Sequence, residues 1–181
     1  MRVSREKAQE NRGRIVAAAA ALFRERGFDG VGVDAIMEKA GLTHGGFYKH
    51  FKSKEALAVE ALEGALAETF EVQKAFTTLS DYVSGYLSRE NRDEIAGGCA
   101  ITAMSADAAR RQDLRRPMGD NVRAQIDSIA ALISTRDKAE ARAEAIAALA
   151  TMVGALALSR AVDDPALSDE ILATSRAKLG A

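Results

Sequence analysis

Apolar residues recur at helical spacing along most of this 181-residue chain. Near the start, Ile15, Ala19 and Phe23 share one face of a predicted helix. That helix should cover residues 5–26 and end at Gly27, a residue type that commonly follows the last helical turn. The same periodicity predicts further helices over residues 33–40, 43–50, 54–74, 76–88, 98–109, 114–135, 137–162 and 166–179. Because little alternation of the kind that marks strands is present, the chain is predicted to be all-α.

Two of the short predicted helices, 33–40 and 43–50, are joined by a turn that contains Gly41. Glycine lets the first helix stop and the second leave at a steep angle, as in a helix-turn-helix. Thr43 is expected to cap the second helix with its side chain. The pattern therefore predicts a DNA-binding motif near the N-terminus.

The second helix of this motif carries two adjacent glycines, Gly45 and Gly46. Each costs about 1 kcal/mol relative to alanine in a helix interior. At Gly45, close approach to the floor of a DNA major groove would explain the missing side chain. For Gly46, tight packing against the preceding helix is the alternative explanation.

Charge is distributed unevenly along the chain. Residues 1–55 contain 11 Lys and Arg against 7 Asp and Glu, a net charge of +4. The other 126 residues contain 14 against 19, a net charge of -5. A basic first third on an acidic body favours an anionic partner for the first third.

Residues 27–57, GFDGVGVDAIMEKAGLTHGGFYKHFKSKEAL, resemble the DNA-binding signature of the TetR/AcrR family of transcriptional regulators. The matching positions are Gly27, Phe28, Val33, Ile36, Ala40, Gly41, Leu42, Gly45, Phe47, Tyr48, His50, Phe51, Ser53, Lys54, Glu55 and Leu57. This resemblance implies phosphate contacts from Tyr48, Lys54 and His50. It implies base reading by Thr43, His44, Gly45 and Lys49.

The resemblance also implies the organisation of the whole chain. An N-terminal three-helix helix-turn-helix DNA-binding domain is expected over residues 1–52, followed over residues 53–181 by a C-terminal helical bundle for ligand binding and dimerisation. Aromatic, isoleucine and methionine side chains of the bundle are candidates for a ligand cavity, with ordinary core packing as the alternative: Phe70, Tyr82, Tyr86, Ile101, Met104, Met118 and Met152. No charged residue is expected to face this interior, which favours an apolar or neutral small-molecule inducer.

The predicted helix 137–162 is apolar on more than one stripe and must be covered on two sides. Together with helix 166–179 it is predicted to form a four-helix interface in a homodimer. The candidate interface residues are Ile146, Leu149, Val153, Leu156, Leu167 and Ile171. The alternative is that these side chains complete the core of the protomer itself. A dimer is also expected because one short recognition helix reads too few bases.

Cys99 is the one cysteine of the chain and follows two glycines at the start of a predicted helix. A helix start lowers a thiol pKa, so Cys99 is a candidate thiol sensor for oxidants or electrophiles. A buried and inert thiol is the alternative. A single cysteine forms no internal disulfide, which favours a cytoplasmic location.

Other classes of function find little support in the sequence. His44 and His50 are six residues apart, so they do not share a helix face for a metal, and no cofactor is expected. No arrangement typical of an enzyme is present. The longest uncharged run, residues 145–159, is too short for a membrane span of about 20 residues. A non-specific architectural DNA binder would carry basic charge over a larger surface.

The sequence thus predicts a dimeric, sequence-specific transcriptional regulator that binds a double-stranded, palindromic operator. Repression, with release by the inducer, is the usual mode in the family that it resembles. The alternative is a redox-sensing or electrophile-sensing regulator that acts through Cys99.

Overall fold

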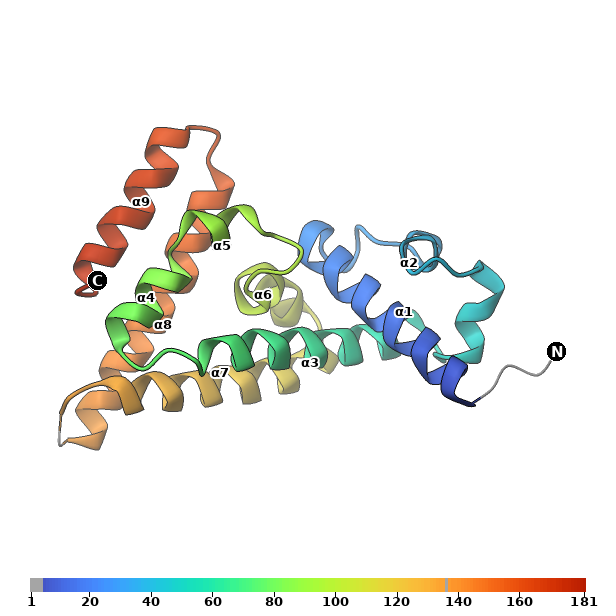
Figure 1. The fold of residues 1–181 in the computed structure, drawn as a ribbon, viewed down its shortest axis with the longest axis horizontal. Coiled ribbons are helices and arrows are strands. Elements are labelled where there is room, and N and C mark those ends of the chain that lie inside the picture. The colour runs from blue at the N-terminus through green and yellow to red at the C-terminus, as the bar shows by residue number, and fades with distance from the viewer. Residues whose placement is uncertain (1–4, 136) are drawn as a thin grey trace.

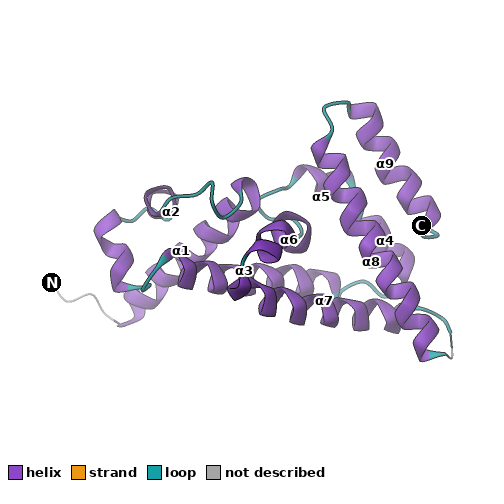
Figure 2. Cartoon of the chain, turned by 180° about the vertical axis from the view of Figure 1, so that it is seen from behind, coloured by secondary structure: helices purple, strands orange, loops and turns teal. Residues whose placement is uncertain are grey.

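The structure is a computed structural model that describes residues 5–135 and 137–181. Within these residues the regular elements are all helices, which confirms the all-α prediction (Figure 1, Figure 2). In chain order they are α1 (Arg5–Arg26), α2 (Val33–Lys39), the 3₁₀-helix η1 (His44–Lys49), α3 (Lys54–Gln73), α4 (Leu79–Tyr86), α5 (Arg89–Asp93), α6 (Ala100–Arg110), α7 (Gln112–Leu132), α8 (Lys138–Ala161) and α9 (Pro165–Lys178).

Helices α1, α2 and η1 form an N-terminal unit with the predicted turns. Gly27 and Gly41 have φ angles of 71° and 65°, a left-handed conformation that glycine adopts without strain. Phe47 of η1 and Ile36 of α2 are fully buried, so the short helices pack through their apolar sides. At the end of this unit Ser53 caps α3, and its hydroxyl accepts the Ala56 N–H at 3.2 Å.

The 3₁₀-helix η1 stands where an α-helix was expected. The Gly46 N–H donates to the Thr43 carbonyl at 2.9 Å, and the His50 N–H donates to the Phe47 carbonyl at 2.9 Å. These bonds span three residues and therefore wind the tighter 3₁₀-helix, which suits a segment with two glycines of low α-helical propensity. Thr43 occupies the N-cap position, but its side chain makes no capping bond, so that prediction was wrong.

Helix α5 was not expected, because residues 89–93 read as a polar break between helices. Ser88 caps it by accepting the Asn91 N–H at 3.1 Å. Five residues are too few to show an apolar stripe, so a local cap and tertiary contacts decide this helix.

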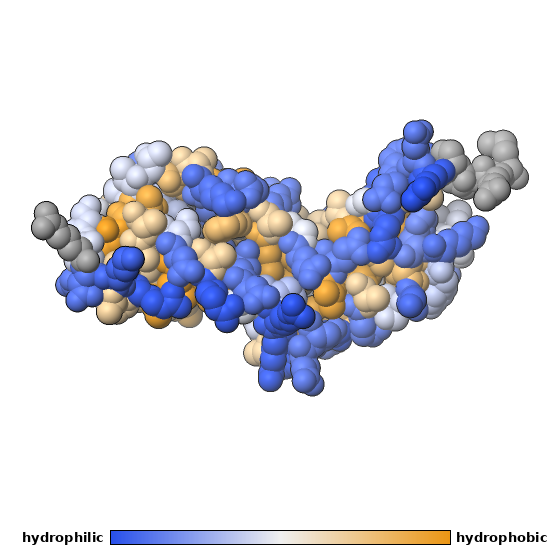
Figure 3. Space-filling model, turned by 90° about the horizontal axis from the view of Figure 1, so that it is seen from below, coloured by the Kyte–Doolittle hydropathy of each residue, from blue (hydrophilic) through white to orange (hydrophobic). Residues whose placement is uncertain are grey.

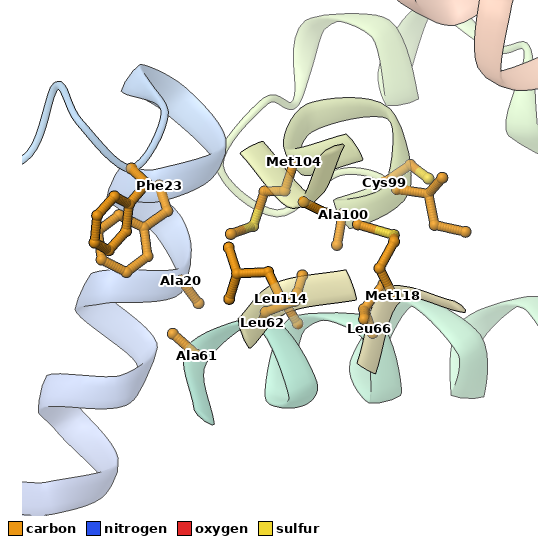
Figure 4. Packing of buried hydrophobic residues seen from close by; sticks show 14 of the residues in the cluster. Ala20, Phe23, Ala61, Leu62, Leu66, Cys99, Ala100, Met104, Leu114 and Met118 are labelled. Atoms are coloured by element: carbon orange, nitrogen blue, oxygen red, sulfur yellow. The ribbon is translucent and has the colours of Figure 1, made fainter. Parts of the chain in front are cut away.

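Helix α3 runs from the N-terminal unit into the body, where α7 lies alongside it and α8 packs against α9 at the far end (Figure 1). Helix α6 packs on α1, α3 and α7. Figure 4 shows part of the shared core: Met104 of α6 lies above Leu62 of α3, and Phe23 of α1 belongs to the same buried cluster. The N-terminal unit and the body therefore share one continuous core.

By length and composition, α8 is long and apolar enough to cross a membrane. Among residues 5–135 and 137–181, no other helix meets this criterion. Of its most apolar window, 39% is buried inside the protein. Core helices of water-soluble proteins meet the same criterion, so this is weak evidence for a membrane span.

Candidate nucleic-acid interface and ligand cavity

The exposed side of η1 carries most of the residues predicted to contact DNA. Thr43, His44, Gly45 and Lys49 are exposed, and the Tyr48 side chain is 68% exposed. Phe47 anchors the element from below, with its ring edge-on to Tyr48 at a centroid distance of 5.2 Å. This buried anchor fixes the direction of the exposed side chains around it.

Neighbouring side chains hold both ends of η1 in place. His44 Nδ1 pairs with a carboxylate oxygen of Asp34 in the first turn of α2. At the other end, Arg12 of α1 donates to the backbone carbonyl of His50 and pairs with Glu60 of α3. The His50 side chain is half-buried. Both ends of η1 are therefore attached to neighbouring helices of the protein.

Lys54, which the resemblance implies contacts phosphate, also has partners within the protein. Its ammonium group donates to the Phe28 carbonyl at 2.7 Å and lies 4.0 Å from the centre of the Phe28 ring. Desolvation by burial lowers the pKa of Lys54. The Arg111 guanidinium lies 3.6 Å from the centre of the same ring. Lys54 thus fastens the turn after α1 in the free protein, and its contact with phosphate stays a prediction.

A cavity of about 400 Å³ opens in the body between the C-terminal end of α3, helices α4 and α5, and the residues that lead into α6. Three aromatic rings lie along it: Phe76 and Tyr82 meet edge-on at 5.8 Å, and Tyr82 stacks near Tyr86 at 6.3 Å. Burial raises the pKa of both tyrosines, so their hydroxyls stay protonated at neutral pH. The cavity therefore offers a neutral aromatic wall.

Of the predicted ligand residues, Tyr82 and Tyr86 line this cavity. Ile101, Met104, Met118 and Met152 are buried in the core, the alternative that the pattern left open. Phe70 is half-buried beneath the Lys74 ammonium, which lies 4.7 Å from its ring centre. Helical periodicity separates core from surface, but it does not show which core positions border an empty space.

The sequence did not reveal the polar residues of the cavity. Glu68, Glu90 and Glu94 are among its lining residues, contrary to the expectation that no charged residue faces it. Gln73 also lines it, and its Oε1 atom is buried without a hydrogen-bond partner among the described residues. These residues come from the end of α3 and from residues 88–99, where no periodic pattern marks an inner face.

Cys99 lies at the edge of the cavity and is 2% exposed. Its Sγ atom is 2.8 Å from the Tyr86 hydroxyl, which also lies 3.1 Å from the Thr102 hydroxyl. In the described part of the chain, no group of three His, Cys, Asp or Glu side chains gathers as a metal site requires. The Cys99 thiol is therefore packed in the protein, next to the hydrogen-bonded hydroxyls of Tyr86 and Thr102.

Comparisons with known proteins agree with this geometry. Residues 15–61 match the family model described as bacterial regulatory proteins, tetR family. An uncharacterized HTH-type transcriptional regulator of Mycobacterium tuberculosis, MT0206, is 29% identical over 165 residues, which cover 84% of this chain and 85% of that protein. The match to the regulator YerO of Bacillus subtilis is more local, with 41% identity over 54 residues, 30% of this chain and 19% of that protein.

A solved structure extends the match over nearly the whole chain. A TetR transcriptional regulator from Chloroflexus aurantiacus has 30% sequence identity and a TM-score of 0.73, and the match covers 96% of this chain and 94% of that one. The chain belongs to the TetR family. It is accordingly a DNA-binding transcriptional regulator. The fold of Escherichia coli NemR in its reduced form is also similar, with a TM-score of 0.77, 21% identity, and coverage of 94% and 95%.

The last two helices of this TetR-family chain leave apolar side chains uncovered. Ile146 and Leu158 of α8 are 47% and 58% exposed, and Leu167 of α9 is 41% exposed. Val153 and Ile171 are half-buried. Figure 3 shows apolar surface beside hydrophilic surface on the lower face of the molecule, with a hollow between its two ends.

Two of the predicted interface residues lie elsewhere. Leu149 and Leu156 are 5% and 0% exposed and belong to the core of the protomer itself. In an amphipathic helix that is apolar on two sides, the sequence does not tell which side faces inward. The tertiary structure makes that assignment.

Proposed function

We propose that this TetR-family protein is a homodimeric repressor that is released from a palindromic operator when a small molecule occupies the cavity between α3, α4 and α5. In this proposal residues 1–52 bind DNA, residues 53–181 bind the ligand and the second protomer, and the protein acts in the cytoplasm without catalysing a reaction. The observation that carries the proposal is a buried arginine, Arg24, that links the cavity wall to the DNA-binding unit.

Arg24 lies near the C-terminal end of α1, and only 3% of its side chain is exposed. Its Nη1 donates to the Gly98 carbonyl at 3.2 Å, and its Nη2 lies 3.4 Å from a carboxylate oxygen of Glu68. Gly98 and Glu68 both line the cavity. A molecule that displaces either residue therefore changes the partners of a buried charge on α1.

A second contact joins the opposite end of α6 to the same unit. The carboxylate of Asp107 accepts the Phe28 N–H at 3.3 Å, and Asp107 is 6% exposed. Thus Gly98, which leads into α6, is bonded to Arg24 of α1, and the C-terminal end of α6 is bonded to the turn that follows α1. Movement of α6 on ligand binding would turn the N-terminal unit relative to the body.

In a dimer, such a turn alters the separation of the two recognition elements, which must fit both half-sites together. Linkage is reciprocal, so operator DNA weakens ligand binding by the factor by which the ligand weakens DNA binding. The charge difference between the two parts of the chain favours the N-terminal unit as the side that meets DNA.

The proposal is tested by selecting bound fragments from a random double-stranded DNA pool with the purified protein at about physiological salt. We expect an enriched inverted repeat, because two copies of η1 read two half-sites in a symmetric dimer. Enrichment of a single half-site would contradict the dimer, and the absence of any enrichment would contradict sequence-specific regulation.

Replacement of Leu158 with glutamate should weaken the dimer. Leu158 is 58% exposed in the protomer, so the change leaves the core intact but places a charge within the proposed interface. We expect the variant to sediment as a monomer and to lose affinity for a full operator by about 100-fold, with less loss for a half-site. Val72 on α3 is 65% exposed and lies by the cavity, away from α8 and α9, so it is a control for dimerisation alone: Val72→Glu should sediment as a dimer.

The redox-sensing alternative rests on Cys99, whose thiol is 2% exposed and adjoins the Tyr86 hydroxyl. Reactive thiols are accessible and are activated by nearby positive charge. Cys99 has two guanidinium groups in its vicinity, those of Arg24 and Arg160, but little access to solvent. This burial favours the small-molecule proposal over the thiol alternative.

A further inference from the structure

The cavity between α3, α4 and α5 is lined by three glutamates and by a buried amide oxygen that has no hydrogen-bond partner among the described residues. We propose that its ligand is a protonated amine with an aromatic or other apolar body. This inference rests on the proposed function, in which the cavity receives an effector, and it assigns the chemical class of that effector.

Gln73 supplies the first argument. The residue is 7% exposed, it lines the cavity, and its Oε1 atom has no hydrogen-bond partner among the described residues. A buried amide oxygen without a partner is costly to keep, so such groups in folded proteins almost always have one. A ligand N–H group in the cavity would supply the missing donor.

Three carboxylates supply the second argument. Glu68, Glu90 and Glu94 line the cavity, whereas its lining contains no lysine, arginine or histidine within the described residues. Glu90 and Glu94 are exposed at the rim. One Glu94 oxygen accepts the Gly97 N–H at 2.8 Å, which leaves the other carboxylate oxygen available to a ligand.

Positive charge behind the wall does not cancel this excess. Arg24 lies 3.4 Å from Glu68, so it compensates that carboxylate. Arg160 is committed to backbone carbonyls, with hydrogen bonds to the carbonyls of Arg92 and Asn91. Two guanidinium groups thus stand behind three carboxylates, so the lining itself carries a net negative charge.

The aromatic wall supplies the third argument, because it accommodates the apolar part of such a molecule. Phe76, Tyr82 and Tyr86 line the cavity with neutral aromatic side chains, which suit an apolar body. Gly85 keeps this wall close-packed, since a Cβ atom there would lie 2.6 Å from the Phe76 ring. An anionic ligand would meet repulsion from the carboxylates at the rim.

The test compares three probes of nearly equal shape on the DNA-free dimer by calorimetry: biphenyl-4-ylmethylamine, biphenyl-4-ylmethanol and biphenyl-4-carboxylate. We expect the amine to bind about tenfold more tightly than the alcohol, and the carboxylate to bind least. Equal or tighter binding of the alcohol or the carboxylate, or no measurable binding of the amine, would overturn the proposal.

Two variants separate charge from hydrogen bonding. Glu90→Gln should lower the affinity for the amine about three- to fivefold and leave the affinity for the alcohol unchanged, because the substitution removes only a charge at the rim. Gln73→Met should lower the affinities for the amine and for the alcohol alike, by about fivefold, because both ligands would donate a hydrogen bond to Oε1. Glu63→Gln, the same charge change at an exposed position of α3 outside the lining, should alter neither. If both cavity variants behave like this control, the assignment of the site is wrong.

Operator release is measured separately with the same three probes. An amine that binds but leaves operator affinity unchanged would uphold the ligand class and contradict the proposed mechanism of release. If only the neutral alcohol releases the protein from operator DNA, the proposed function is upheld and the amine assignment is overturned.

Discussion

A Gly45→Leu variant should lose about 1,000-fold in affinity for its operator while remaining as stable as the unaltered protein. An added Cβ at Gly45 would meet no atom within 4 Å, and the residue does not have a positive φ angle. The free protein therefore accepts a side chain there, and leucine has the higher helical propensity. If η1 enters the major groove, the same side chain holds the backbone away from the base edges. Affinity then falls toward that for random DNA.

The Gly45 prediction is checked by thermal unfolding and by operator titration on the same preparation. Gly119→Leu is the matched control, because Gly119 of α7 is exposed and an added Cβ meets nothing within 4 Å there either. It should leave both stability and operator affinity unchanged. If Gly45→Leu binds the operator with the affinity of the unaltered protein, this part of η1 does not approach DNA closely.

Replacement of Gly98 with alanine should lower the stability by about 3 kcal/mol. The added Cβ would lie 2.2 Å from the Glu94 carbonyl oxygen and 2.8 Å from Arg160 Nη2. A backbone oxygen is not free to move away, so the loop before α6 must shift. That shift also disturbs the Gly98 carbonyl, which accepts a hydrogen bond from Arg24. For a chain of this size the melting temperature should fall by about 6–12 °C.

The adjacent glycine provides the control for Gly98. A Cβ at Gly97 would meet only side-chain atoms of Glu94, at 3.3 to 3.5 Å, and that flexible side chain has room to give. We expect Gly97→Ala to change the melting temperature by no more than about 2 °C. Differential scanning calorimetry distinguishes the two variants. Equal melting temperatures would mean that the loop before α6 is free to adjust, and that the Arg24 contact is not rigidly held.

Both predictions concern glycines whose roles differ in how far they can be read from the sequence. The helix-turn-helix signature placed Gly45 on the recognition element, because this motif depends on neighbouring residues at fixed spacing. Gly98 occurs in a loop without any periodic pattern. Its close contacts come from Glu94 and Arg160, and only the fold brings α8 next to the loop before α6.

The sequence by itself determined the all-α class, the helix-turn-helix and the helices long enough to show an apolar stripe, since these depend on local spacing. Only the tertiary structure decided that Lys54 fastens Phe28, that Leu149 and Leu156 face the protomer core, and that Gln73 borders a cavity with three glutamates. These facts depend on which surfaces meet across long stretches of sequence, and helical periodicity carries no information about the partner that each face will find.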